Sequence, residues 1–392
     1  MAATSCRIKS LCGQSLGRPD SRFSPNMSRL ILGWVVTAAF VLSTGVASAA
    51  SASAASSRRP AVRHRVQPVD PTAGDDIEGD DPTVRRAAVE ALGPRRGSVV
   101  VVDPNSGRVL TIVGQKLAFE TGFIPCSTIK LVTALAALTE HVVERDTFIR
   151  IGRYISYNMT TALARSNNEY FGALGSRLGF ERVVHYARMM GLGEKAGLDI
   201  SGEQPGEVAA EQPKGSMILM TAYGEGFQMT PLELAALLSA IANGGTLYYL
   251  QHPRSAEEAA HLTPQVKRQL DLAPNGIDDI KMGMRGSVEY GTGRNAAYDP
   301  NEPILGKTGT CTDYRAGNFM GWFGSFNEVG FHKLVVVVML ASPYKGVNGG
   351  LASAVAGSVY RNLSGQRYFT ADGASRQPGM PEILVTSPCC SR

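Results

Sequence analysis

Ser127 and Lys130 lie three residues apart at the start of a strongly helical run, Leu131 to Glu140. Side chains at positions i and i+3 share one face of a helix, so this spacing places a hydroxyl beside an amine. A lysine can accept the proton of a serine only while it is partly neutral, and the apolar residues around Lys130 disfavour its ammonium form. The pattern also suits a helix N-cap beside a solvated lysine, so the pair alone does not establish a site.

Two further short motifs follow in the chain. Ser166-Asn167-Asn168 opens or interrupts a helix, and Lys307-Thr308-Gly309-Thr310 stands at the start of a late set of strands. The three motifs in this order resemble those of the serine penicillin-recognising enzymes, which include penicillin-binding protein transpeptidase domains and serine β-lactamases. Sequences flanking the motifs are similar to the same family, and the resemblance covers roughly residues 97 to 365.

The resemblance implies three catalytic residues. Ser127 would attack a carbonyl group and become acylated, with Lys130 as the base that removes its proton. Ser166 would relay that proton to the leaving amine. The backbone N–H groups of Ser127 and Thr310 would form an oxyanion hole, in which each donor lowers the barrier by roughly 3–4 kcal/mol.

The resemblance also implies a set of substrate-binding residues. Asn168 would hold a substrate amide and position the lysine base. Lys307 would bring positive potential that suits a substrate carboxylate, and Thr308 and Thr310 would offer it hydroxyl groups. Gly309 would let the strand backbone come close to the substrate.

Two cysteines adjoin the motifs, Cys126 directly before Ser127 and Cys311 directly after Thr310. If the late strand flanks the nucleophile helix as it does in the family, the β-carbons of the two cysteines converge. An oxidising compartment would then favour a disulfide, and the pairing resembles a cystine found in a subgroup of class A β-lactamases. The alternative is a pair of buried free thiols.

The machinery for rapid hydrolysis of an acyl-enzyme is not evident in the sequence. The E-x-x-L-N pattern of class A β-lactamases does not occur between Ser166 and Lys307. A class D enzyme would pair a carboxylated lysine with a nearby tryptophan, but the only tryptophans are Trp34, in an N-terminal apolar segment, and Trp322. These observations favour a penicillin-binding D,D-peptidase, either transpeptidase or carboxypeptidase, that acts on peptidoglycan stem peptides and is blocked by β-lactams. A serine β-lactamase and a non-catalytic β-lactam sensor are the alternatives.

Composition narrows the remaining classes of function. The chain of 392 residues is 44% hydrophobic and 19% charged, which suits a globular protein with an ample core. Its formal net charge of +5 is mild, and the absence of a long basic block argues against nucleic-acid binding. The histidines and cysteines do not fall at metal-ligand spacings, so we expect no metal and no cofactor. The sequence indicates no particular protein partner or oligomeric state.

An apolar segment near the N-terminus, Leu30 to Leu42, follows several basic residues and precedes the small residues Ala47-Ser48-Ala49. This order predicts a secretory signal peptide or, with the stretch to Ala50 included, an uncleaved membrane anchor of about 20 residues. The preceding positive charge places the N-terminus inside, so the catalytic part is expected in the periplasm or at the cell surface. Met27 is an alternative start to Met1.

Strand patterns at both ends of the folded part, with helical periodicity between them, predict an α+β fold with one sheet and a helical insertion. The resemblance implies that the sheet is antiparallel and five-stranded. We expect an N-terminal extension over 1–55, a disordered linker over 56–96, a catalytic domain over 97–365 with a helical subdomain at about 140–245, and a flexible tail over 366–392. Predicted strands include 98–103, 108–113, 319–326 and 333–341; predicted helices include 157–178, 180–190, 231–243, 278–289 and 351–363.

Overall fold

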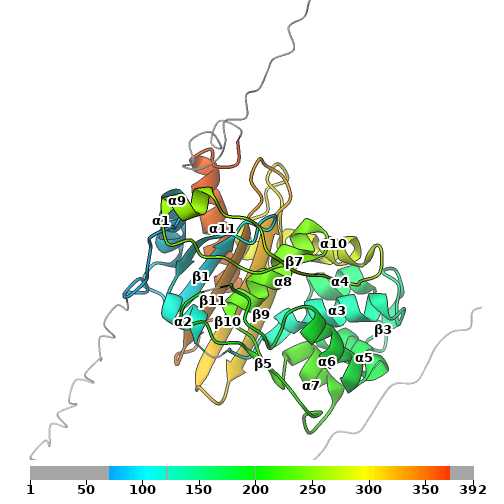
Figure 1. Cartoon of the computed structure of the whole chain (residues 1–392). Helices are drawn as coiled ribbons and strands as arrows, with labels where there is room; N and C mark the ends of the chain where they lie inside the picture. The colour runs from blue at the N-terminus through cyan, green and yellow to red at the C-terminus, as the bar shows by residue number, and fades with distance from the viewer. Residues whose placement is uncertain (1–69, 121, 199, 371–392) are drawn as a thin grey trace, which may run out of the picture. The chain divides into compact units, whose positions relative to one another are not determined.

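The computed structural model describes residues 70–120, 122–198 and 200–370 (Figure 1). The predicted signal peptide or anchor and most of the predicted tail lie outside the described residues. Within the described part of the chain, no helix has the length and apolar character needed to cross a membrane.

A five-stranded antiparallel sheet forms the centre of the fold, and it confirms the predicted fold class. Its strand order is β2-β1-β11-β10-β9, so β1 from the start of the domain pairs with β11 from its end. β9 therefore lies at one edge of the sheet. The strands are β1 (Gly97–Val102), β2 (Val109–Val113), β9 (Ile304–Asp313), β10 (Asn318–Asn327) and β11 (Val335–Ser342).

Both faces of the sheet are buried, which explains the unbroken valine run of β1. Successive side chains of a strand point to opposite faces, and here Val99 and Val101 belong to one hydrophobic cluster while Val100 and Val102 belong to another. The helices α1 (Pro82–Leu92) and α11 (Gly349–Gly365) cover the first face. The helix α8 (Pro231–Asn243) covers the second.

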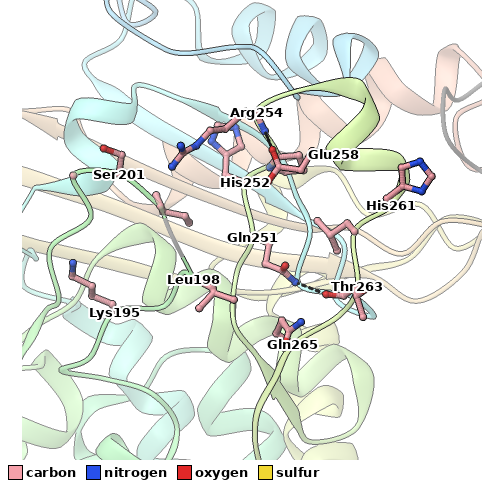
Figure 2. Close-up of a pocket in the computed structure, with 14 residues that line it drawn as sticks. Lys195, Leu198, Ser201, Gln251, His252, Arg254, Glu258, His261, Thr263 and Gln265 are labelled. Atoms are coloured by element: carbon pink, nitrogen blue, oxygen red, sulfur yellow. Dashed lines mark hydrogen bonds between the residues drawn. The ribbon is translucent and has the colours of Figure 1, made fainter.

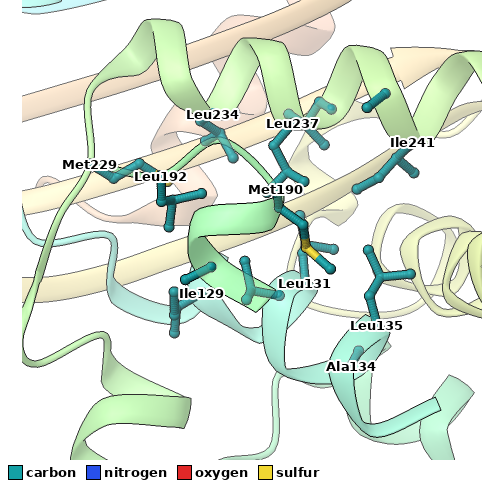
Figure 3. Close-up of a cluster of buried hydrophobic side chains, with 14 of the residues drawn as sticks. Ile129, Leu131, Ala134, Leu135, Met190, Leu192, Met229, Leu234, Leu237 and Ile241 are labelled. Atoms are coloured by element: carbon teal, nitrogen blue, oxygen red, sulfur yellow. The ribbon is translucent and has the colours of Figure 1, made fainter. Parts of the chain in front are cut away.

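The nucleophile segment packs between α8 and the helical insertion. It consists of the 3₁₀ helix η1 (Cys126–Ile129), which leads directly into α3 (Lys130–Thr139). Leu131 and Leu135 of α3 pack in the same buried cluster as Leu234 and Leu237 of α8 (Figure 3). This apolar packing fixes the motif relative to the sheet.

The helical insertion gathers on one side of the sheet (Figure 1). Its helices α4 and α10 pack together, as do α5 and α7. The predicted helix over 157–178 is two helices, because the chain turns at Ser166, whose φ of 54° is left-handed. The prediction of an all-helical block to 245 is also imprecise, since α8 packs on the sheet. The insertion comprises α4 (Met159–Ala164), α5 (Asn168–Leu178), α6 (Phe180–Met189), α7 (Met217–Tyr223) and α10 (Gly276–Glu289).

Short elements complete the described chain. Three two-stranded antiparallel sheets lie among the helices, and the strands of two of them flank a short helix, α7 between β5 and β6 and α9 between β7 and β8. These short elements are α2 (Gln115–Phe119), β3 (Ile149–Arg150), β4 (Ser156–Tyr157), β5 (Glu207–Val208), β6 (Phe227–Gln228), β7 (Thr246–Tyr248), α9 (Ala256–Ala260), β8 (Val266–Gln269) and η2 (Arg294–Ala296).

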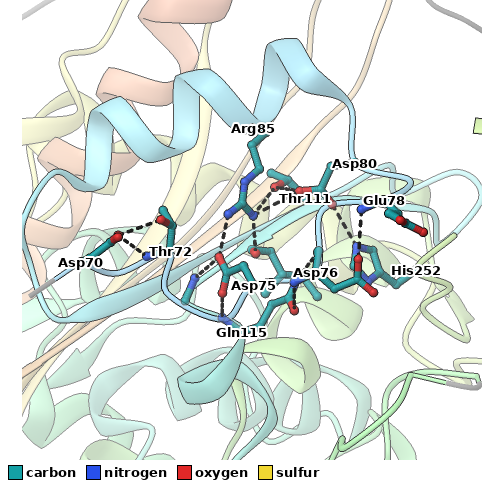
Figure 4. Close-up of polar contacts among 12 residues, drawn as sticks. Asp70, Thr72, Asp75, Asp76, Glu78, Asp80, Arg85, Thr111, Gln115 and His252 are labelled. Carbon is teal, nitrogen blue, oxygen red and sulfur yellow. Dashed lines mark hydrogen bonds and ion pairs between the residues drawn. The ribbon is translucent and has the colours of Figure 1, made fainter. Parts of the chain in front are cut away.

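The prediction of a disordered linker is wrong for residues 70–96. Asp81 caps α1 by accepting hydrogen bonds from the first backbone N–H groups of the helix, and the apolar face of α1 is buried against the sheet. The acidic residues that suggest a solvated tether instead pair internally. Arg85 lies 2.8 Å from Asp75 and 3.2 Å from Asp80, and Asp80 also lies 2.9 Å from His252 (Figure 4).

The end of the folded part also lies beyond the predicted boundary at 365. Tyr368 and Phe369 are buried in the cluster that contains α1 and α11, and the Tyr368 hydroxyl donates to Asp81 Oδ2 over 3.1 Å. The described chain therefore stays folded to residue 370.

Candidate active site

Ser127 lies in the short η1 turn, and Lys130 begins α3. The Lys130 side chain is fully buried, and its Nζ lies 2.9 Å from Ser127 Oγ. Burial lowers the pKa of Lys130 from 10.5 to about 7, because an apolar environment disfavours the ammonium form. The local spacing thus places a hydroxyl against an amine that is partly neutral at physiological pH.

The second motif contacts the same amine from the turn between α4 and α5. Lys130 Nζ donates to the Ser166 carbonyl oxygen over 2.8 Å and to Asn168 Oδ1 over 2.6 Å, and it lies 3.1 Å from Ser166 Oγ. The carbonyl and amide oxygens can only accept hydrogen bonds. A neutral Lys130 has two hydrogens, so these two acceptors use both of them and leave its lone pair for the Ser127 hydroxyl.

The third motif brings a second buried lysine into the network. Lys307 Nζ donates to Ser166 Oγ over 2.8 Å and to the Thr308 carbonyl oxygen over 2.8 Å. Complete burial, together with the charge of Lys130, lowers the pKa of Lys307 well below its usual value. The Ser166 hydroxyl therefore connects the two amines, which gives a continuous path for a proton.

The threonines of β9 have different surroundings. Thr310 is exposed at the sheet edge, and its hydroxyl oxygen accepts a hydrogen bond of 2.8 Å from Gly349 N, which leaves the hydroxyl hydrogen free to donate. Thr308 is buried, and its hydroxyl lies 2.6 Å from that of Thr292. The structure thus directs Thr308 toward a neighbouring side chain, whereas Thr310 can meet a ligand.

Gly309 of β9 lies against the nucleophile turn. A β-carbon at this position would lie 3.0 Å from the Pro125 carbonyl oxygen and 3.2 Å from Thr128 Cγ2. The residue therefore allows β9 to pack closely against the nucleophile turn. That Gly309 also lets the strand backbone come close to a substrate stays a prediction.

A disulfide joins Cys126 to Cys311, with their Cα atoms 5.6 Å apart. It connects the residue before Ser127 to the residue after Thr310, so it ties η1 directly to β9. Trp322 Nε1 donates to the Ile124 carbonyl oxygen over 3.1 Å and adds a second link between the sheet and this turn. These links hold in register the two segments whose backbone N–H groups the resemblance assigns to the oxyanion hole.

Two residues that the motifs do not reveal also contact the site. They are consecutive at the end of α7: Ser127 Oγ lies 3.3 Å from the Ala222 carbonyl oxygen, and Asn168 Nδ2 donates to the Tyr223 hydroxyl over 2.8 Å. Tyr223 also lines a cavity of about 840 Å³ that runs beside β9 from Thr310 onward. No local spacing relates α7 to the motifs, so only the tertiary structure shows this contact.

A second cavity, of about 790 Å³, lies between the segments 195–202 and 251–265 (Figure 2). None of the motif residues or their two cysteines lines it. The amine and hydroxyl groups that could perform acyl transfer converge instead beside β9. Across the described parts of the chain, no group of three or more His, Cys, Asp or Glu side chains could hold a metal ion.

Comparison with known proteins gives one family. Residues 97–364 match the family model described as the penicillin binding protein transpeptidase domain. Stage V sporulation protein D of Bacillus subtilis is 28% identical over 312 residues, which cover 69% of this chain and 48% of that protein. Peptidoglycan D,D-transpeptidase MrdA of Acinetobacter baumannii is 26% identical over 304 residues, which cover 62% of this chain and 45% of that protein.

Solved structures share the fold. The transpeptidase domain of penicillin-binding protein 3 from Burkholderia pseudomallei superposes with a TM-score of 0.62 at 19% identity, covering 78% of this chain and 98% of that one. The chain spans about half the length of the curated relatives it matches. Because the family model covers most of the chain and the three motifs meet in one site, the chain belongs to the penicillin-binding protein transpeptidase domain family.

Proposed function

We propose that this protein is a serine-type D,D-peptidase that acts on peptidoglycan stem peptides through an acyl-enzyme on Ser127. The observation that carries the proposal is the 2.9 Å contact between Ser127 Oγ and Lys130 Nζ, an amine with a pKa of about 7. Its relatives include proteins named peptidoglycan D,D-transpeptidase, and the name of that activity supplies the substrate class. A β-lactam would acylate the same serine.

The residues suit a two-step acyl transfer. In the first step, Ser127 Oγ attacks the carbonyl carbon of the penultimate D-alanine, and Lys130 takes the hydroxyl proton. The bond to the terminal D-alanine breaks, and its amine receives that proton through the Ser166 hydroxyl, which touches both buried lysines. In the second step, an amine or water attacks the ester carbonyl and gives up a proton to Lys130; the bond to Ser127 Oγ breaks, and Lys130 returns the proton to that oxygen.

The substrate carboxylate would bind between Lys307 and Thr310. Lys307 is buried and its pKa is lowered, and an incoming carboxylate restores the ammonium form because opposite charges stabilise each other. The free hydroxyl hydrogen of Thr310 can donate to the same group. This arrangement favours peptides with a free C-terminal carboxylate.

Transfer to an amine would make the protein a transpeptidase, and transfer to water would make it a carboxypeptidase. In the described part of the chain, no carboxylate hydrogen-bonds to Ser127, Lys130, Ser166 or Lys307. Without a carboxylate in contact with these groups to activate water, the site favours an acyl-enzyme that lasts long enough to meet an amine. We therefore favour transpeptidation.

The proposed location is outside the cytoplasm, in the periplasm or at the cell surface. The disulfide beside the nucleophile suits an oxidising compartment, and the N-terminal apolar segment suits export or anchoring. A membrane contact through that segment follows only if it is not cleaved.

The test uses the purified chain with a peptide donor that ends in D-Ala-D-Ala, with and without an amine acceptor. We expect release of D-alanine and formation of the cross-linked product, and neither with Ser127→Ala. Rapid turnover of a chromogenic β-lactam with no peptide turnover would instead identify a β-lactamase. Stable labelling by penicillin with no peptide turnover would identify a sensor.

A further inference from the structure

The end of α7 contacts both the first and the second motif. The Ala222 carbonyl oxygen lies 3.3 Å from Ser127 Oγ, and the hydroxyl of the next residue, Tyr223, accepts a hydrogen bond of 2.8 Å from Asn168 Nδ2. α7 itself packs against α5, the helix that Asn168 begins. A fourth element, outside the three motifs, thus reaches the reacting groups.

Asn168 is held at both ends of its side-chain amide. Its Oδ1 accepts from Lys130 Nζ over 2.6 Å, and its Nδ2 donates to Tyr223. The two partners come from different elements, α3 and α7, so together they fix the rotation of the amide group. Nδ2 carries two hydrogens, so one remains for a substrate after the other binds Tyr223.

The orientation of this amide decides what Lys130 can do. While Oδ1 faces Lys130, it takes one of the amine's hydrogens, and the Ser166 carbonyl takes another. If the amide turned away, the freed hydrogen of Lys130 would compete for Ser127 Oγ, and the lone pair would no longer face the hydroxyl. Holding the amide therefore keeps the amine ready to accept the serine proton.

We infer that Tyr223 is a positioning residue for acylation: its hydroxyl holds Asn168 so that Oδ1 faces Lys130. The inference rests on the proposed function, because it concerns the acylation of Ser127. Tyr223 is 39% exposed and lines the cavity beside β9, so removing its hydroxyl leaves no unpaired polar atom in a buried position. Tyr223→Phe should therefore leave the fold intact.

The test follows acylation of the full chain by a fluorescent penicillin over a range of concentrations. This separates the acylation rate constant from the non-covalent binding constant. We expect Tyr223→Phe to lower the rate constant about 2- to 12-fold, the equivalent of one neutral hydrogen bond, and to change the binding constant by a smaller factor. Tyr154→Phe is the matched control, because Tyr154 is 85% exposed and its hydroxyl has no hydrogen-bond partner among the described residues.

A double-mutant cycle distinguishes positioning from a general structural effect. If Tyr223 acts through Asn168, Tyr223→Phe should cause no further loss in an Asn168→Ala background, since coupled residues are not additive. The inference would be overturned if Tyr223→Phe were acylated at the wild-type rate, or if Tyr223→Phe lowered the rate by the same factor in the wild-type and Asn168→Ala backgrounds. The proposed function would stand in either case. A wild-type chain that no penicillin labels would overturn the proposed function and this inference with it.

Discussion

The ionisation of Lys130 sets a pH dependence that the site should display directly. Acylation requires the neutral amine, and burial lowers the pKa of Lys130 to about 7. The acylation rate should therefore rise about tenfold per pH unit below pH 7 and level off above it. At pH 5 the neutral fraction is about 1%, so the rate should be about 100-fold below its plateau.

The assay is the rate of labelling by a fluorescent penicillin between pH 5 and 9, with unfolding followed in parallel so that loss of structure is not mistaken for loss of chemistry. Lys130→Met should not be labelled at any pH in this range. A rate that is flat from pH 5 to 7, or one that is still rising tenfold per unit at pH 9, would refute the assignment of Lys130 as the buried base.

The same pKa also predicts how stability changes with pH. Lowering the pKa from 10.5 to about 7 corresponds to about 5 kcal/mol. The unfolded chain binds this proton between these two pH values and the folded chain does not, so the free energy of unfolding rises with pH across that window. Below pH 7 the folded state bears the full penalty.

Lys130→Met isolates the contribution of this one group. Lys307, whose pKa burial lowers in the same direction, remains in both proteins, and above pH 7.5 Lys130 is mostly neutral, so its charge no longer acts on Lys307. Between pH 7.5 and 9.5 the wild type should therefore gain about 1.4 kcal/mol per pH unit relative to the variant in urea unfolding. Equal slopes for the two proteins would contradict the depressed pKa.

Three further perturbations test the packing around the site. Replacing both Cys126 and Cys311 with serine removes a link between residues 185 apart and should lower the free energy of unfolding by about 2–5 kcal/mol, and an unchanged urea midpoint would contradict this. Glu233 accepts hydrogen bonds from three backbone N–H groups through its two oxygens. Glu233→Gln should therefore lower the free energy of unfolding by about 1–3 kcal/mol in the same assay, and an unchanged free energy would contradict this. Arg85→Ala removes the guanidinium that pairs with Asp75 and Asp80 and should cost about 1.5–3 kcal/mol, because both carboxylates keep other hydrogen-bond partners. Arg86→Ala, at an exposed neighbour, should not lower stability, and equal thermal midpoints for the two variants would show that the network is dispensable.

Much of the site could be predicted from the sequence because its first motif is local. Ser127 and Lys130 are three residues apart, and the turn of the helix alone brings them into contact. The distant motifs at Ser166 and Lys307 could be placed only through resemblance to a family. In the structure they meet at the Ser166 hydroxyl, which lies within 3.1 Å of both lysines.

The segment before the sheet shows why charge patterns mislead. Asp75 and Asp80 suggest a solvated tether when they are considered alone. Their partners are set by the fold, since Thr111 is 31 residues from Asp80 and His252 is 172 residues away. Pairing at such separations leaves no periodic signal in the sequence. The buried face of α1 leaves only a weak one.

The contribution of α7 could not be predicted for the same reason. Tyr223 lies 55 residues from Asn168, and the hydrogen bond between them depends on how α5 and α7 pack. The environments of Thr308 and Gly309 also depend on tertiary contacts, with Thr292 and with Pro125. Motif residues therefore revealed the chemistry, and only packing revealed how each of them is held.

The central claim is that Ser127 forms an acyl-enzyme. Intact-protein mass spectrometry of the chain after exposure to a penicillin, followed by peptide mapping, tests it most directly. We predict one adduct of one penicillin mass, located on the peptide that contains Ser127, and none on Ser127→Ala. An unmodified wild-type chain, or an adduct that maps to another residue and persists in Ser127→Ala, would contradict the account.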